Sequence, residues 1–220
     1  MDFAMSTKGG AQIKSRYMEP PEFQEIPARR VKYKYAEQFA KDMVIQPGCK
    51  YFAYINGTFI AGDFIEALIV NKALKVKRLA INTYSLSENN VDSLANLLDG
   101  YVDDLTLIVS DFFFVNERRN LIPYIYQELD KDNRFQLAVC TTHCKTALIQ
   151  TGDGLFITVH GSANFRSSSS LEHIAIEEGK ELHNFALEVD DAILAKYATI
   201  RKSIPKKDLW ETVVAKDLPQ

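Results

Sequence analysis

The chain has 220 residues, of which 46% are apolar and 25% are charged. This composition is typical of a globular protein and excludes the collagen-like, coiled-coil and intrinsically disordered classes. With 26 basic and 29 acidic residues, the net charge is −3, so bulk positive charge does not attract the chain to nucleic acid or to an anionic membrane. Binding of either kind must come from a local patch.

The cysteines and the apolar stretches indicate in which cellular compartment the protein acts. Three cysteines are an odd number for a disulfide framework and favour a reducing cytoplasm. Residues 1–14 are short and polar, unlike a signal peptide. The longest apolar stretch, residues 64–70, is interrupted by Glu66 and is too short to span a membrane. We therefore expect a cytoplasmic protein with no membrane partner.

Composition divides the chain into three parts. Residues 1–45 are expected to form an N-terminal arm, because they contain glycine and proline and show little apolar periodicity. This arm is locally basic: residues 1–34 hold seven lysines and arginines against four acidic residues. Residues 46–201 are predicted to form one α/β domain, and residues 202–220 a C-terminal extension. Both a mobile terminus and a partner-binding arm are compatible with the N-terminal part.

The first half of the domain alternates between strand and helix patterns. Turn residues, capping residues and apolar spacing predict the following order: strand 51–55, turn Asn56-Gly57, helix 64–75 capped by Asp63, strand 76–82, a helix capped by Ser87, strand 105–110, helix 116–130 and strand 135–139. Pro123 falls near the start of the last helix or at a kink within it. The alternation from residue 76 to 139 favours an α/β layer with parallel neighbouring strands.

The second half of the domain changes character. Residues 145–150 and 155–160, separated by a turn at 151–154, predict a β-hairpin. A polar loop over 161–170, a strand over 171–176 and a long amphipathic helix over 181–201 follow. His183 is expected on the surface of that helix.

One region combines reactive side chains with regular spacing. His143 and Lys145 are two residues apart, so on a strand both would leave by the same face. Gly161 follows a strand and permits a close approach of the backbone, and Ser162 and Asn164 supply neutral donors. An imidazole, a fixed positive charge and several donors suit the oxygens of a phosphoryl group.

These residues resemble the phospholipase D superfamily. The motif of that family is His-x-Lys, four residues and Asp, followed by Gly-Ser-x-Asn, and it matches here at His143, Lys145, Gly161, Ser162 and Asn164. The sequence from Gly161 to His173 is similar to that of single-motif members, which are often encoded by phages and mobile elements. The resemblance implies an α/β fold, with a phospholipase D-like mixed sheet flanked by helices on both faces.

Two positions depart from the family pattern. The aspartate of the motif falls at Gln150, and the gap before Gly161 is longer than usual. In the family this aspartate supports the motif and is not the nucleophile.

The resemblance also implies a mechanism without metal or cofactor. His143 would attack phosphorus to form a phosphohistidine, and a second histidine would protonate the leaving alkoxide. Lys145 and Asn164 would hold the phosphoryl oxygens with support from Ser162, and Glu172 would orient a His143 imidazole. Because the chain has one motif and no internal repeat, a homodimer with His143 of each subunit in one pocket is the expected completion.

The expected substrate is nucleic acid, DNA rather than RNA, in the cytoplasm of a bacterial host if the protein is phage-encoded. Arg166, Ser167 and Ser168 are candidates for phosphate contacts. Tyr84 and Phe112 to Phe114 follow strand ends, where aromatic rings can stack on bases, although core packing is expected for most of that run. The alternative is a catalytically impaired module of the same fold that binds nucleic acid or serves a structural role in a virion. Gln150, in place of the motif aspartate, is the feature that favours this alternative.

Overall fold

The computed structural model describes residues 36–55, 59–166 and 170–199. Most of the predicted N-terminal arm, the C-terminal extension, the Asn56-Gly57 turn, Ser167 and Ser168 lie outside the described residues. The three-part division of the chain therefore stays a prediction.

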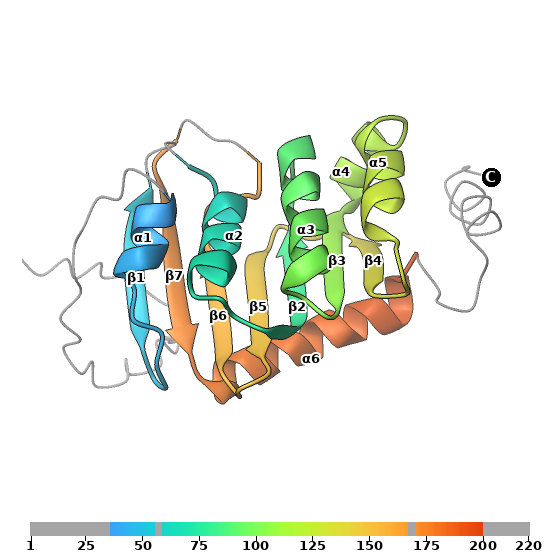
Figure 1. Cartoon of the computed structure of the whole chain (residues 1–220). Coiled ribbons are helices and arrows are strands. Elements are labelled where there is room, and N and C mark those ends of the chain that lie inside the picture. Colours follow the sequence, from blue (N-terminus) through green and yellow to red (C-terminus); the bar gives the residue numbers. More distant parts are fainter. Residues whose placement is uncertain (1–35, 56–58, 167–169, 200–220) are drawn as a thin grey trace, which may run out of the picture.

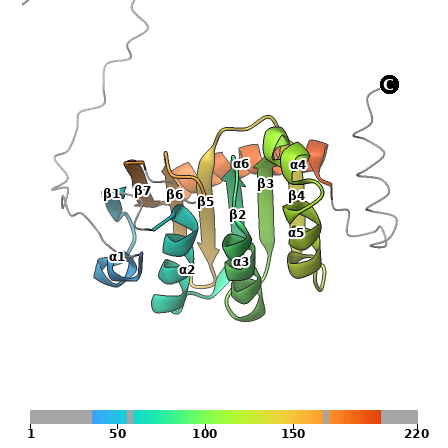
Figure 2. The ribbon, with the colours of Figure 1, turned by 90° about the horizontal axis from the view of Figure 1, so that it is seen from above.

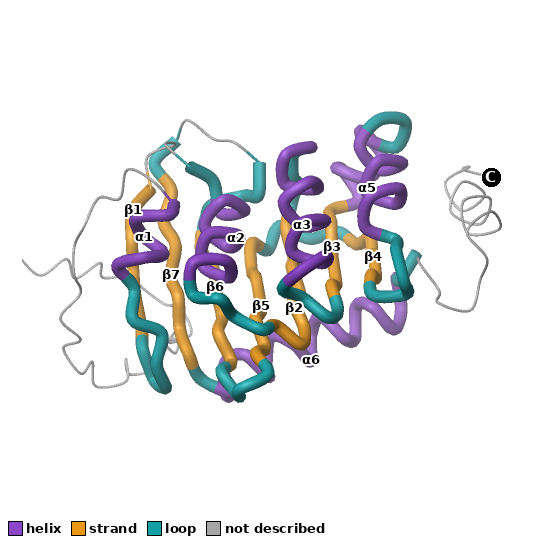
Figure 3. The backbone as a smooth tube through the Cα atoms, viewed as in Figure 1, coloured by secondary structure: helices purple, strands orange, loops and turns teal. Residues whose placement is uncertain are grey.

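Within the described ranges, seven strands form a single mixed sheet in the order β1-β7-β6-β5-β2-β3-β4 (Figures 1 and 3). Strands β2, β3 and β4 are parallel, and the other neighbours pair antiparallel. The strands are β1 (Lys50–Ile55), β2 (Val76–Thr83), β3 (Leu105–Ser110), β4 (Phe135–Cys140), β5 (Lys145–Thr151), β6 (Phe156–Gly161) and β7 (Glu172–Glu178).

Helices cover both faces of the sheet. Helices α1, α2, α3 and α5 lie on one face, and α6 crosses the other (Figure 2). The helices are α1 (Ala36–Asp42), α2 (Ala61–Asn71), α3 (Glu88–Gly100), α4 (Asp111–Glu117), α5 (Leu121–Leu129) and α6 (Lys180–Tyr197). The predicted α/β class, a mixed sheet with helices on both faces, is confirmed.

Burial explains the parallel part of the sheet. All six residues of β3 are buried, as expected for a parallel strand covered on both faces. The helices between β2, β3 and β4 return the chain to the start of the next strand, so these three strands end at the same edge of the sheet. The predicted parallel neighbours are confirmed.

Local capping corrects two predicted boundaries. The single helix predicted over 116–130 is two helices, because the Ser110 hydroxyl accepts a hydrogen bond from the Phe113 amide at 3.0 Å and starts α4 at Asp111. Pro123 lies in the first turn of α5, where a missing amide hydrogen costs little. Asp63 does not cap α2 from outside: it is the third helical residue, and its carboxylate accepts from the Ile60 amide at 3.2 Å.

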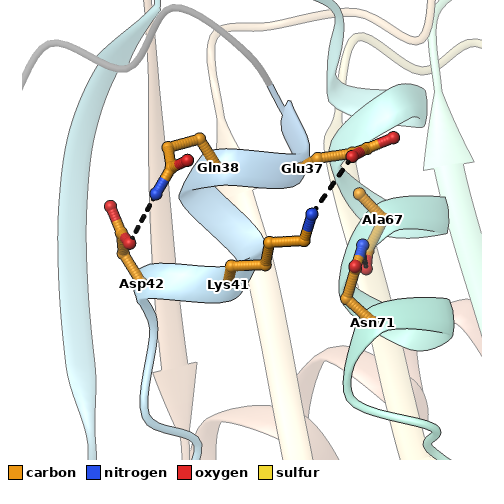
Figure 4. A network of polar contacts seen from close by, with 6 residues as sticks. All are labelled: Glu37, Gln38, Lys41, Asp42, Ala67 and Asn71. Carbon is orange, nitrogen blue, oxygen red and sulfur yellow. Dashed lines mark hydrogen bonds and ion pairs between the residues drawn. The ribbon is translucent and has the colours of Figure 1, made fainter.

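Helix α1 shares the core of the sheet layer. It packs against α2, and the ring of its buried Phe39 stacks on Phe64 with 4.6 Å between centroids. Its solvent side carries two contacts between residues four apart, Glu37–Lys41 and Gln38–Asp42 (Figure 4). Such exposed pairs add little stability, so the apolar contacts hold α1 in place.

Helix α6 buries polar side chains. His183 and Asp190 are its fully buried residues among those described, while Leu182, Phe185 and Val189 are exposed. The prediction that His183 lies on the surface is therefore wrong: its residue exposure is 1%, and its ring meets Phe156 edge-on. Burial lowers the pKa of His183 below its ordinary value of 6.5, because the charged imidazolium loses water.

The buried His183 predicts a pH-dependent stability. Below pH 6.5 the unfolded chain takes up a proton that the folded protein resists, so the free energy of unfolding falls as the pH drops from 6.5 toward the lowered pKa. Urea unfolding of the wild type and of His183→Gln, from about pH 7 to about pH 5, measures this effect. We expect a smaller loss in the variant, and equal losses in the two proteins would contradict the assignment.

Candidate phosphodiester-binding site

The topology brings the two halves of the motif to one edge of the sheet. Lys145 is the first residue of β5, Gly161 the last residue of β6 and Glu172 the first residue of β7, and these three strands pair antiparallel. Strands β2, β3 and β4 end at the same edge, the upper one in Figure 1. Residues far apart in the sequence therefore converge there.

His143 and Lys145 are in contact. The Lys145 Nζ lies 3.2 Å from His143 Nδ1 and donates a hydrogen bond to the His143 carbonyl at 2.9 Å. His143 lies in the loop that precedes β5, and not on the strand, so the prediction that both side chains leave a common strand face is wrong. The two groups meet because the lysine folds back onto the loop backbone.

Burial and charge act on Lys145 in opposite directions. Partial burial lowers the pKa of Lys145 below its ordinary value, and the nearby Glu172 carboxylate partly offsets this shift. A partly desolvated ammonium is a stronger electrostatic partner for an anion than a fully hydrated one. Lys145 is thus suited to hold a phosphoryl oxygen.

Ser162 and Glu172 form a connected pair beside Lys145. The Ser162 hydroxyl donates to the Glu172 carboxylate and accepts from the His173 amide at 3.1 Å. The Ser162 amide donates to the His173 carbonyl at 3.2 Å. The Glu172 carboxylate thus accepts from Ser162 of its own chain, and its expected role in orienting a His143 imidazole stays a prediction.

Gly161 is required by a close backbone approach. A Cβ atom at this position would lie 2.1 Å from the His173 carbonyl oxygen, which is far inside van der Waals contact. The expected close approach is therefore present, and it fixes the start of the Ser162 loop against β7.

Asn164 and Arg166 occupy different surroundings. Asn164 is half-buried, and its Oδ1 has no hydrogen-bond partner among the described residues. An unpaired buried oxygen is costly, so a donor from a ligand or a second chain would stabilise it. Arg166 is exposed and lines a hollow of about 450 Å³ with Ser87 and Tyr124, a hollow that neither His143 nor Lys145 borders.

A polar network behind the site was not predicted from the sequence. The Asn82 amide donates to the buried Asp190 carboxylate at 3.1 Å, and the Thr142 hydroxyl donates to Asn82 Oδ1 at 2.9 Å. The Thr142 hydroxyl also accepts from the Cys144 amide at 3.1 Å. The network connects α6 through β2 to the loop that carries His143. Burial raises the pKa of Asp190, and its hydrogen bond from Asn82 acts against that rise.

Aromatic rings lie beside His143. The Tyr84 ring is 5.0 Å from the His143 ring and 5.7 Å from the Phe112 ring, measured between centroids. Phe113 and Phe114 are buried, which confirms the expectation that most of this run packs in the core, while Phe112 is exposed.

The described part of the chain lacks two features, a cluster of metal-ligating side chains and a helix that could cross a membrane. No three histidine, cysteine, aspartate or glutamate side chains gather there in a way that would hold a metal ion. None of the helices described combines the length and the apolar character that crossing a membrane requires.

The sequence matches no family model, and no curated protein matches it. Solved structures resemble parts of this chain. Nuc from Salmonella typhimurium, a phospholipase D family member, is 15% identical, with a TM-score of 0.49 over 68% of this chain and 96% of that one. Polyphosphate kinase from Porphyromonas gingivalis is 14% identical, with a TM-score of 0.50 over 76% of this chain and 30% of that one. Yeast tyrosyl-DNA phosphodiesterase is 14% identical, with a TM-score of 0.30 over 46% and 25% of the two chains.

At such identities the likeness concerns the fold. The predicted α/β fold, a mixed sheet flanked by helices on both faces, is confirmed, and polyphosphate kinase shares it at a TM-score of 0.50. The chemistry of the site has to be argued from the side chains of this chain.

The close approach at Gly161 predicts the effect of a single methyl group. Gly161→Ala should lower the free energy of unfolding by about 1–3 kcal/mol, because the added Cβ meets a backbone carbonyl that cannot yield without moving β7. Urea unfolding measures the change. Gly100→Ala is the matched control, because its Cβ would meet no atom within 4 Å and should be neutral or stabilise α3 by about 0.5–1 kcal/mol. Equal effects of the two substitutions would contradict the close approach.

Proposed function

We propose that this protein is a metal-independent phosphodiesterase of the phospholipase D type that acts on nucleic acid, DNA rather than RNA. One observation carries the proposal: the contact between the Lys145 ammonium and the His143 imidazole at the sheet edge where β6 ends at Gly161, directly before Ser162. A nucleophile beside a fixed positive charge is what displacement at phosphorus needs.

The reaction proceeds in two displacements. A ring nitrogen of His143 attacks phosphorus, so that a nitrogen–phosphorus bond forms and a phosphorus–oxygen ester bond breaks. The leaving alkoxide takes a proton from a second histidine. That histidine then removes a proton from water, which attacks the phosphohistidine and frees His143. Lys145 neutralises charge on the phosphoryl oxygens throughout, and no metal is needed.

The ligand-free geometry indicates the first event on binding. Lys145 donates to Nδ1, so a neutral His143 carries its proton on Nε2. Attack through Nε2 therefore requires two changes: the ammonium leaves Nδ1 for a phosphoryl oxygen, and the ring proton moves by way of water from Nε2 to Nδ1, so that the Nε2 lone pair faces phosphorus. Transfer of Lys145 from the imidazole to the phosphate would couple substrate binding to activation of the nucleophile.

The second histidine is proposed to come from a second copy of the chain. His160 lies 3.4 Å from the Glu177 carboxylate, and His173 stacks on Phe52 with 5.4 Å between centroids, so both are engaged elsewhere on the sheet. In a symmetric homodimer, His143 of each subunit would face the other. Glu172 would then orient the imidazole of the partner chain while holding Ser162.

Gln150 is compatible with catalysis because of its position. It lies five residues along β5 from Lys145, which corresponds to about 16 Å. It lies opposite Arg78 of β2 in the strand register, at the end of β5 away from His143. The Arg78 side chain forms an ion pair with Asp191. An acidic residue at position 150 would support the scaffold and would not touch the phosphate.

A second candidate is a catalytically impaired module of the same fold that binds nucleic acid or serves a structural role in a phage or virion. Its support is that one chain supplies only part of the proposed site. His143 is exposed and contacts Lys145, and the Glu172 carboxylate accepts from Ser162. Action in the cytoplasm is a prediction from the cysteine content, and a bacterial host is expected if the protein is phage-encoded.

Hydrolysis in the presence of EDTA tests the proposal. Wild-type protein is expected to cleave DNA, or a chromogenic phosphodiester, at a rate that EDTA does not change. His143→Ala should lower that rate at least about 10²-fold, because the nucleophile is lost. His160→Ala is the matched control and should retain activity, since His160 pairs with Glu177. RNA assayed in parallel reports the substrate preference.

Two outcomes would contradict this function. If the wild type and His143→Ala are equally inert while both bind DNA, the non-catalytic module is the better account. If light scattering at micromolar concentration shows a fully active monomer, the site shared between two copies is wrong.

A further inference from the structure

We infer that Tyr84 and Phe112 form a stacking platform for an unpaired nucleobase next to the phosphate site. This inference rests on the proposed function and narrows its substrate to a single-stranded segment. The two rings are nearly parallel, with 18° between their planes and 5.7 Å between centroids. The Tyr84 ring in turn contacts His143, so the platform begins at the nucleophile.

The exposure of Phe112 sets it apart from its neighbours. Its residue exposure is 59%, whereas Phe113 and Phe114 are each 3% exposed on the same short helix. Core packing accounts for Phe113 and Phe114 but not for a large aromatic side chain left in water. An exposed aromatic ring next to a candidate phosphate site is the arrangement with which proteins stack bases.

The platform and the phosphate-binding groups are adjacent. The Lys145 Nζ lies 3.2 Å from His143 Nδ1 and 6.0 Å from the centroid of the Tyr84 ring. The rings therefore continue outward from the ammonium in the order Tyr84, Phe112. A nucleotide whose phosphate binds Lys145 has this aromatic surface beside its sugar, where its own base or the next one can stack.

Hydrogen bonds hold the platform in place. The Ser110 hydroxyl donates to the Tyr84 carbonyl at 2.7 Å and accepts from the Phe113 amide at 3.0 Å, so one side chain fixes both parts. Asp111 accepts from the Phe112 amide at 2.8 Å and from the Thr141 hydroxyl at 2.8 Å. Both oxygens of this carboxylate are thus engaged. Backbone segments that are fixed before binding lose little conformational entropy when a base arrives.

Stacking on this surface selects for unpaired bases. In a duplex, neighbouring base pairs cover both faces of each base, so a ring outside the helix reaches none of them. In a single strand the faces are free, and every base offers one. The platform should therefore favour single strands over duplexes with little preference among sequences.

Binding of a single-stranded DNA oligonucleotide that carries 2-aminopurine tests the platform. Both the reference protein and its variants carry His143→Ala, so the oligonucleotide stays intact during the titration. Adding Phe112→Ala should weaken binding about tenfold and reduce the quenching of 2-aminopurine that stacking produces. Phe112→Trp should restore both. Val115→Ala is the matched control: Val115 is 62% exposed on the same helix and should leave binding unchanged.

An abasic oligonucleotide of the same length separates stacking from phosphate contacts. The inference expects Phe112→Ala to have no effect on its affinity, because the backbone alone cannot stack. Equal losses for the abasic and the complete strand, or no loss for either, would overturn the platform. Tighter binding of a matched duplex than of the single strand would overturn it as well.

The outcomes also distinguish this inference from the proposed function. EDTA-resistant cleavage that requires His143 but is insensitive to Phe112→Ala, with unchanged affinity for single strands, would leave the phosphodiesterase standing and remove the platform. An inert wild type whose binding of single strands still depends on Phe112 would remove the phosphodiesterase and retain the platform.

Discussion

The close approach of Gly161 to the His173 carbonyl is the constraint on which the site depends. Strands β6 and β7 can meet at that distance only because position 161 carries no Cβ. Their meeting fixes the Ser162 hydroxyl between the Glu172 carboxylate and the His173 amide. Since β5 pairs with β6 in register, the same constraint sets where Lys145 emerges at the sheet edge.

The opposite side of the site is held by a buried polar network. Asp190 of α6, Asn82 of β2 and Thr142 of the His143 loop are connected by two hydrogen bonds. This connection accounts for a buried aspartate on the 18-residue helix α6. A carboxylate inside the fold is costly unless it is hydrogen-bonded; Asp190 Oδ1 accepts from Asn82, whereas Oδ2 has no partner among the described residues. The network connects the position of the His143 loop to the packing of α6. The strand register thus sets the position of Lys145, and the polar network sets the position of the loop that carries His143.

The order of strands and helices followed from the sequence because apolar periodicity and capping residues are local signals. The strand over 105–110 and the parallel alternation up to residue 139 were predicted correctly for this reason. Helix α4 was missed because its three consecutive phenylalanines have no helical periodicity, and because Ser110, which caps it, was assigned to the strand before it.

The candidate site was predictable as a set of residues, but not as a geometry. Spacing indicated that His143 and Lys145 belong together, yet their contact comes from the lysine folding back onto a loop and not from a common strand face. The hydrogen bond from Ser162 to Glu172 was not predicted, because it depends on the register of β6 and β7. His183 and Asp190 could not be predicted as buried, because polar residues on an amphipathic helix ordinarily face water.

The central claim is that His143 becomes covalently bonded to phosphorus during turnover. Rapid acid-free quenching of wild-type protein with a DNA substrate, followed by proteolysis and mass spectrometry under alkaline conditions, measures this directly. The account predicts a phosphoramidate adduct on the peptide that contains His143, present in EDTA and absent from His143→Ala. Cleavage by the wild type with an unmodified His143 peptide at every quench time, or an adduct on another residue, would contradict it.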